Sequence, residues 1–196
     1  TAEEFKIAVG EKTGYKMEQE DFVAAEEFNV AVGEETGYQE YKEDLNSGSR
    51  SAIAGGITTV FDMPNNNPSI STKKIFKKKL SDAKNRMFCN YAFYFGAEKD
   101  NTAEIKKIER EDGCCGIKVF VGVSTGTLLV ENYSDIKKIM KSTKKMISFH
   151  SEDQGVLNKR KKYIKRGDPK SHPIWRNESV CLTCTKHLVK LANLTK

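Results

Sequence analysis

The chain has 196 residues, the length of one ordinary domain, and a net charge of +6 from 33 Lys+Arg against 27 Asp+Glu. No apolar run approaches the roughly 18–20 residues that span a bilayer, so we expect no membrane partner. The lysines are scattered over most of the length, and no nucleic-acid-binding motif accompanies them. We therefore predict a solvated surface and no nucleic-acid partner.

The cysteines and the first residue bear on location and completeness. Five cysteines form an odd set without a secretory signal, which favours free thiols in a reducing cytoplasm. Cys181 and Cys184 have the spacing of half a zinc site, but no second pair follows them. We expect both to be small buried residues on one helix face with Leu188 and Leu191. The start at Thr1, without methionine, indicates a fragment.

The first 38 residues differ in pattern from the rest of the chain. Residues 3–15 are echoed by residues 26–38 almost letter for letter, and two copies are too few for a solenoid. We predict two units, a duplicated acidic and irregular extension of residues 1–38 and a folded domain of residues 39–196. We assign no chemistry to the extension.

Beyond the extension, helical and strand patterns alternate four times, which predicts right-handed crossovers and a parallel sheet. This order fits either a doubly wound sheet or a (β/α)8 barrel, and a whole barrel needs about 250 residues, so the chain could supply about half of one. Predicted strands are residues 57–61, 88–95, 116–121 and 146–149; predicted helices are 41–54, a helix from Ser71, 101–111, 132–143, 152–166 and 177–194.

Lys118 is the most unusual residue of the predicted sheet. It lies inside the apolar strand 116–121, where a charged amine is costly unless it is paired or chemically altered. One solution is a carbamate formed with carbon dioxide, an anion whose two oxygens could bridge two divalent metals. The alternative is a lysine that extends to the strand end or pairs with a carboxylate.

Other polar residues also follow strands, where parallel α/β folds place their sites. His150 ends the next strand and could ligate a metal, or it could make a helix-entry hydrogen bond. Asn65 could bind a substrate carboxylate or carbonyl, or it could serve the turn after Asp62. His172, Arg176 and Glu178 could face the substrate or anchor the last helix, and His187, in the middle of that helix, is expected to be structural.

Taken together, these motifs resemble the dihydroorotase, hydantoinase and allantoinase branch of the amidohydrolase superfamily. The matching text comprises residues 42–50, 54–65, 116–120, 124–126 and 150–153, then His172, Pro173, Arg176 and Glu178. The resemblance implies a (β/α)8 barrel of the metal-dependent hydrolase type with two zinc ions. It implies that Lys118 is the carbamylated bridging lysine, that His150 ligates the second metal and that Asn65 binds the substrate carboxylate. The implied reaction interconverts carbamoyl aspartate and dihydroorotate, small molecules of pyrimidine biosynthesis.

The chain departs from the family pattern at both ends. The family's His-x-His pair and arginine are absent from the corresponding residues 30–37, and the chain ends at Lys196, before the family's next histidine strand and the late aspartate that acts as general base. Our leading interpretation is a cyclic amidohydrolase of the dihydroorotase type whose chain is incomplete or altered. The alternative is a catalytically inactive homologue with a role in assembly or regulation.

Two further expectations concern partners and substrate. Half a barrel has open sheet edges, so we predict that the isolated chain self-associates, for example as a homo-oligomer. The motifs do not separate a dihydroorotate ring from a hydantoin or allantoin ring.

Overall fold

The predicted alternation of helices and strands is confirmed in the computed structural model, which describes residues 44–123 and 127–195. The first unit that we predicted, residues 1–38, lies outside the described residues. The elements are α2 (Leu45–Ala54), β1 (Thr59–Asp62), α3 (Lys73–Ala83), β2 (Asn90–Gly96), α4 (Thr102–Ile108), β3 (Cys114–Phe120), α5 (Tyr133–Ser142), β4 (Ile147–His150), α6 (Gln154–Arg160), η2 (Lys161–Tyr163), η3 (Pro169–Ser171), α7 (His172–Trp175) and α8 (Glu178–Asn193).

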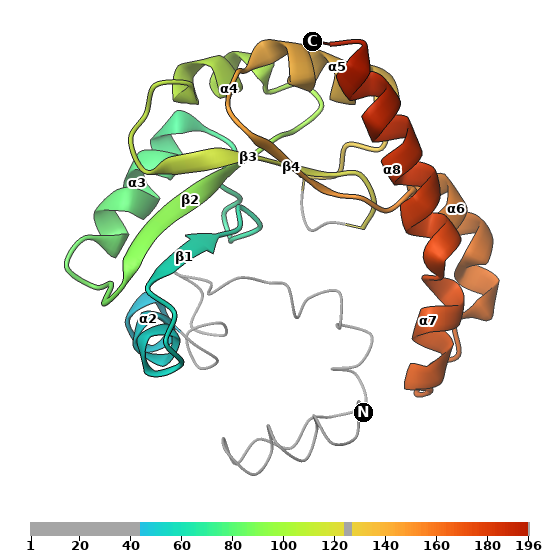
Figure 1. Ribbon diagram of the computed structural model, residues 1–196, viewed down its shortest axis with the longest axis horizontal. Coiled ribbons are helices and arrows are strands. Elements are labelled where there is room, and N and C mark those ends of the chain that lie inside the picture. Colours follow the sequence, from blue (N-terminus) through green and yellow to red (C-terminus); the bar gives the residue numbers. More distant parts are fainter. Residues whose placement is uncertain (1–43, 124–126, 196) are drawn as a thin grey trace.

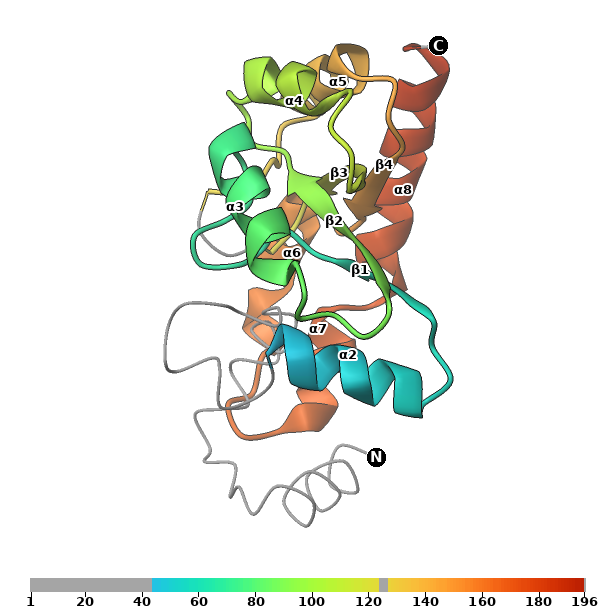
Figure 2. The ribbon, with the colours of Figure 1, turned by 90° about the vertical axis from the view of Figure 1, so that its left-hand side faces the viewer.

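The strands form one parallel sheet with the order β1-β2-β3-β4, so each strand lies beside its neighbour in the sequence. The sheet is curved, and α3, α4, α5 and α8 lie along its convex side (Figure 1). Figure 2 shows the same arrangement from the side of α3 and β2. A doubly wound sheet carries helices on both faces. The one-sided helices and the sequential strand order therefore identify part of a (β/α)8 barrel, as the family resemblance implied.

The hydrophobic core lies between the sheet and its outer helices. Ile117 and Val119 of β3 are fully buried against Ile105 of α4 and Ile136 of α5. Because successive strand side chains point to opposite faces, these contacts assign the alternate residue Lys118 to the concave face. The alternation of side chains along β3 thus gives an apolar face toward the helices and an opposite, concave face that carries Lys118.

Several element boundaries follow from local capping. The side chain of Thr72 accepts a hydrogen bond from the backbone N–H of Ile75, which starts α3 where Ser71 and Thr72 predicted a helix. At the end of α2, the backbone N–H of Ile57 donates to the carbonyl of Ala52, and Gly56 has φ +82°. Ile57 therefore belongs to the helix-ending turn, and β1 begins at Thr59 rather than at residue 57.

The predicted helix over residues 152–166 is shorter in the structure. It begins at Gln154, ends at Arg160 and continues as a 3-10 turn. The chain then reverses, and the indole of Trp175 donates a hydrogen bond to the carbonyl of Leu157 at 3.1 Å. Burial of Trp175 against α6 stabilises this reversal, which the helical pattern alone did not reveal.

The prediction for the two cysteines of α8 was correct for one of them. Cys184 is fully buried with Val180 and Leu188, but Cys181 is exposed. Val180, Cys184 and Leu188 follow a spacing of four residues, so the buried stripe of the helix is narrow and Cys181 lies beside it. Among the residues that the structure describes, no helix is long and apolar enough to cross a membrane.

Candidate active site

Lys118 and His150 lie on the same face of the sheet. In the register of β3 and β4, Lys118 is beside Ser148 and Phe120 is beside His150. Residues two apart on a strand share a face, and so do partners on neighbouring strands. Both side chains contact the ring of Phe120: the Lys118 amine lies 5.2 Å from its centroid, and the His150 ring centroid lies 6.0 Å from it. The structure therefore brings the two predicted metal ligands together on the concave face.

The Lys118 amine is held in a poorly solvated position. The residue is partly buried, and within residues 44–123 and 127–195 no carboxylate forms an ion pair with it. Loss of hydration disfavours the charged ammonium, so burial lowers the pKa of Lys118 below its ordinary value of 10.5. A lowered pKa increases the fraction of neutral amine, which is the form that reacts with electrophiles. The pairing alternative for this lysine has no support in the described residues.

His150 is bound to a carboxylate two residues further along the chain. Its Nε2 lies 2.7 Å from Oε2 of Glu152, whose backbone N–H donates to the carbonyl of His150 at 3.1 Å. Next to it on the same face, the Ser148 hydroxyl donates to the Tyr94 hydroxyl at 2.9 Å. The neighbourhood of His150 is thus polar and connected to β2.

Glu152 is itself held by Arg176, which follows α7. Nη2 of Arg176 lies 3.1 Å from Oε2 of Glu152, and Nη1 lies 3.4 Å from Nε2 of His172. Burial opposes the charge on Glu152, whose residue is 9% exposed, but the hydrogen bond with His150 and the charge of Arg176 outweigh burial and lower the pKa of the carboxyl. Glu152 is therefore an anion at neutral pH.

Sequence reasoning assigned no role to Glu152 and left Arg176 between substrate contact and helix anchoring. The structure joins Arg176 to the candidate metal ligand through Glu152. The sequence did contain a pattern that indicates a role for Glu152, because this carboxylate follows the strand-end histidine His150 by two residues. The partner of that carboxylate was not visible, since Arg176 is distant in sequence.

Asn65 lies in the loop after β1, at the same end of the sheet. Its residue is 5% exposed. The loop is fixed to the end of β2, because the backbone N–H of Ile70 donates to Pro64 and that of Gly96 donates to Ile70. Gly96 is beside Lys118 in the register, and a side chain at Gly96 would meet Pro64 and Leu128. The loop that carries Asn65 thus packs near the strand end of Lys118, and binding of a substrate carboxylate by Asn65 stays a prediction.

Asp62, the last residue of β1, faces the opposite side of the sheet from Lys118. Its register partner is Phe93, a core residue, so its side chain faces the helices. There it lies 3.3 Å from the Lys79 amine of α3, which is also 5.6 Å from the Phe93 ring centroid. Asp62 therefore anchors β1 to α3 and does not face the concave side.

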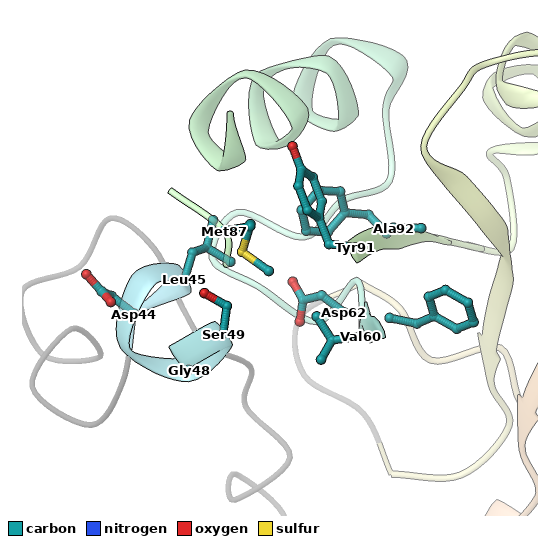
Figure 3. Close-up of a pocket in the computed structure, with 11 residues that line it drawn as sticks. Asp44, Leu45, Gly48, Ser49, Val60, Asp62, Met87, Tyr91 and Ala92 are labelled. Atoms are coloured by element: carbon teal, nitrogen blue, oxygen red, sulfur yellow. The ribbon is translucent and has the colours of Figure 1, made fainter. Parts of the chain in front are cut away.

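A cavity of about 170 Å³ lies between α2 and the first two strands, β1 and β2. Figure 3 shows Leu45 and Ser49 of α2 on one side of it, with Val60 and Asp62 of β1 on the other. Its lining does not include Lys118 or His150. The cavity is therefore separate from the candidate active site, and it is smaller than the roughly 300 Å³ of common ligand pockets.

Among the described residues, two of the predicted ligands, Lys118 and His150, are available to bind a metal. Lys118, as a carbamate, and His150 have the chemistry that zinc accepts, whereas no group of three or more His, Cys, Asp or Glu is placed to hold a metal there. The described residues thus fit part of a metal centre. Residues 30–37, where the family has its His-x-His pair, and residues 124–126 of the resemblance lie outside the described residues.

Comparisons with known proteins agree with this architecture. No protein-family profile matches the chain. Dihydroorotase of Thermococcus kodakarensis is 35% identical over 111 residues, which are 57% of this chain and 25% of that protein. Allantoinase of Arabidopsis thaliana is 38% identical over 78 residues, 38% of this chain and 15% of that protein. The structure of an L-hydantoinase from Arthrobacter aurescens superposes with a TM-score of 0.71 at 23% identity, covering 77% of this chain and 35% of that one.

These similarities confirm the resemblance that the motifs indicated. The sequence relatives are dihydroorotase and allantoinase, and the hydantoinase structure confirms the partial barrel. The chain spans about a quarter of the length of the dihydroorotase that it matches. The relatives are named as enzymes, which supports the resemblance to hydrolases and lends no support to the inactive alternative.

Proposed function

We propose that this dihydroorotase-like chain forms part of a metal-dependent cyclic amidohydrolase, which hydrolyses the C–N bond of a cyclic amide and interconverts carbamoyl aspartate and dihydroorotate. One observation carries the proposal. A partly buried lysine of lowered pKa lies on the same sheet face as a strand-end histidine, and both contact the Phe120 ring. The comparisons supply the reaction class.

The chemistry of Lys118 begins from its neutral amine. Its nitrogen attacks carbon dioxide, an N–C bond forms, one C=O bond becomes a C–O⁻ group, and the amine proton leaves to solvent. The product is a carbamate anion with two oxygens. This conversion replaces a poorly solvated cation by an anion that cations can stabilise, which explains a lysine on this strand with no carboxylate partner among residues 44–123 and 127–195.

Lys118, as its carbamate, and His150 would hold zinc. When bound, zinc polarises a ring carbonyl and lowers the pKa of a water that it binds. Catalytic zinc sites commonly have three protein ligands, so the proposal requires at least one ligand beyond the two that the described residues offer. Asn65 would bind the carboxylate of the substrate through its amide. The proposal also includes a location in the cytoplasm, because free cysteines are typical of a reducing compartment. The proposed reaction belongs to pyrimidine biosynthesis.

Metal analysis of the purified chain with zinc and bicarbonate tests the proposal. We expect near-stoichiometric zinc in the unsubstituted chain and its loss in Lys118→Ala. Lys138→Ala is the matched control, because the Lys138 side chain is 67% exposed and pairs only with Asp135 of its own helix turn among described residues. Zinc absent from the unsubstituted chain, or retained in Lys118→Ala, would contradict the proposal.

The substrate ring is tested separately. Dihydroorotate, hydantoin and allantoin are titrated into the same zinc-loaded preparation, and the dissociation constant of each is measured by calorimetry. Binding is the readout because the chain lacks the residue that the family uses as general base. We expect dihydroorotate to bind most tightly, and binding of hydantoin or allantoin alone would keep the amidohydrolase class and reject the dihydroorotase assignment.

A further inference from the structure

A polar chain of three side chains runs from Arg176 through Glu152 to His150. We infer that Glu152 and Arg176 are positioning residues, which fix the protonated nitrogen and the orientation of the His150 ring so that Nδ1 is the donor to a metal. The inference rests on the proposed function, in which His150 is a metal ligand. It adds two residues whose role is to hold that ligand.

The contact between His150 and Glu152 determines which ring nitrogen carries the proton. Nε2 of His150 lies 2.7 Å from Oε2 of Glu152. The same Oε2 atom faces Nη2 of Arg176 at 3.1 Å, and a guanidinium can only donate, so this oxygen acts as an acceptor. We assign Nε2 of His150 as a second donor to it, which places the ring proton on Nε2. A neutral imidazole with its proton on Nε2 has its lone pair on Nδ1. Metal-ligating histidines commonly donate their other N–H to a carboxylate in this way, which fixes the ring and makes the ligating nitrogen more basic.

Arg176 holds the carboxylate in place. Nη2 of Arg176 lies 3.1 Å from the same Oε2 atom that faces His150, and Glu152 is 9% exposed. A carboxylate with so little access to water needs a cation or donors to stay ionised. The arginine supplies the charge, and the histidine supplies a second donor. Glu152 can therefore remain an anion while it is directed at His150.

The protein scaffold fixes Arg176 before any ligand binds. Its guanidinium lies over the Trp175 ring, 5.0 Å from the centroid, and its backbone N–H donates to the carbonyl of His172 at 2.8 Å. Trp175 is anchored in turn by its indole hydrogen bond to Leu157. These contacts hold the guanidinium of Arg176, the residue that follows α7, beside Glu152.

The backbone around Glu152 is fixed as well. The N–H of Asp153 donates to the carbonyl of Val180 at 3.2 Å, which ties the turn to α8. Gly122, after β3, passes so close that a Cβ there would lie 2.5 Å from the Glu152 carbonyl oxygen. The turn thus has little freedom to move, as a group that orients a ligand requires.

Two measurements test the inference, and the first needs no metal. In metal-free protein at about pH 8, where an ordinary imidazole is neutral, nitrogen NMR should place the His150 proton on Nε2. Its N–H signal should be protected from exchange with water. We expect this protection to be lost in Glu152→Met, which removes the acceptor at similar size, and kept in Glu152→Gln, which retains a neutral acceptor.

The second measurement is the dissociation constant of zinc alone, by calorimetry. We expect Glu152→Met and Arg176→Met to weaken zinc binding by about 10- to 100-fold, the usual effect of losing a partner of a metal ligand. Glu152→Gln should weaken it less, and Arg176→Lys should restore part of the affinity lost in Arg176→Met. Lys186→Gln is the control, because Lys186 is exposed on α8, and it should change neither readout.

The outcomes separate this inference from the proposed function. A proton on Nδ1, or a protected signal that persists in Glu152→Met, overturns the inference even if zinc binds. Unchanged zinc affinity in the folded variants Glu152→Met and Arg176→Met also overturns it. If the unsubstituted chain binds no zinc, the metal role fails together with the proposed function, and the NMR result decides whether the hydrogen-bonded chain exists. Circular dichroism of each variant identifies loss of folding.

Discussion

Replacing Lys79 by methionine should destabilise the protein strongly, because it leaves the buried Asp62 carboxylate without its cation. The two side chains are 6% and 15% exposed, and their charged atoms lie 3.3 Å apart. At 3.3 Å the attraction is about 5 kcal/mol for an effective dielectric constant of about 20. Removing both groups from water costs several kcal/mol per ion, so the intact pair contributes about zero overall. The Lys79→Met variant lacks this attraction but still has a carboxylate at Asp62 that is removed from water. We therefore expect its free energy of unfolding to fall by about 3–5 kcal/mol.

A double-mutant cycle by urea denaturation measures this effect. Asp62→Val combined with Lys79→Met should restore the free energy of unfolding to at least that of the unsubstituted chain, because no buried charge remains. Lys77→Met is the matched control on the same helix. The Lys77 side chain is 58% exposed and lies 3.7 Å from Glu111, so its loss should change stability by no more than about 0.5 kcal/mol.

The pH dependence gives a second readout with a defined sign. Burial is the largest influence on the Asp62 carboxyl and raises its pKa above 3.8, against the attraction of Lys79. A folded-state pKa above the unfolded value means that the ionised form costs stability, and this cost decreases as the pH falls through the folded-state pKa toward 3.8. Without Lys79 that pKa rises further, so the deficit of Lys79→Met should shrink from about pH 7 to about pH 5. A deficit below about 1 kcal/mol at neutral pH, or one that grows on acidification, would refute this reasoning.

Two further predictions concern close packing and association. Gly122→Ala should lower the free energy of unfolding by about 1–3 kcal/mol in urea denaturation, since its Cβ would lie 2.5 Å from the Glu152 carbonyl oxygen; an unchanged midpoint would contradict the close approach. The isolated chain should self-associate in light scattering, because Phe61 and Met146 are 52% and 60% exposed and the described sheet ends at the edges of β1 and β4. Serine at both positions should reduce the association, and a monodisperse monomer of the unsubstituted chain would reject the prediction.

Much of the architecture follows from the sequence because local signals repeat. Gly55 and Gly56 end one helix, Thr72 caps another, and β-branched runs separate the helices, so strand and helix order is determined locally. The same reasoning noticed Lys118, since a charged residue in an apolar strand conflicts with its surroundings. The sequence therefore indicated the class of fold, and its motifs indicated the family.

The sequence did not determine on which face each strand-end residue lies. Side chains alternate along a strand, so a change of one residue in register moves a residue from the helix-covered face to the concave face. The register with Phe93 directs Asp62 toward Lys79, whereas the register between β3 and β4 puts Lys118 and His150 on one side. Local patterns contain no information on this pairing, which depends on contacts between distant segments.

By itself, then, the sequence determined the alternating elements, the unusual lysine and the histidine at the end of the next strand. Only the tertiary structure decided that Arg176 reaches Glu152, which reaches His150. The physical reason is that a buried carboxylate such as Glu152 needs a nearby cation. The packing of Trp175 against α6 places the neighbouring Arg176 beside it. Residues far apart in the sequence can form such a pair, because the fold determines how close they lie in space.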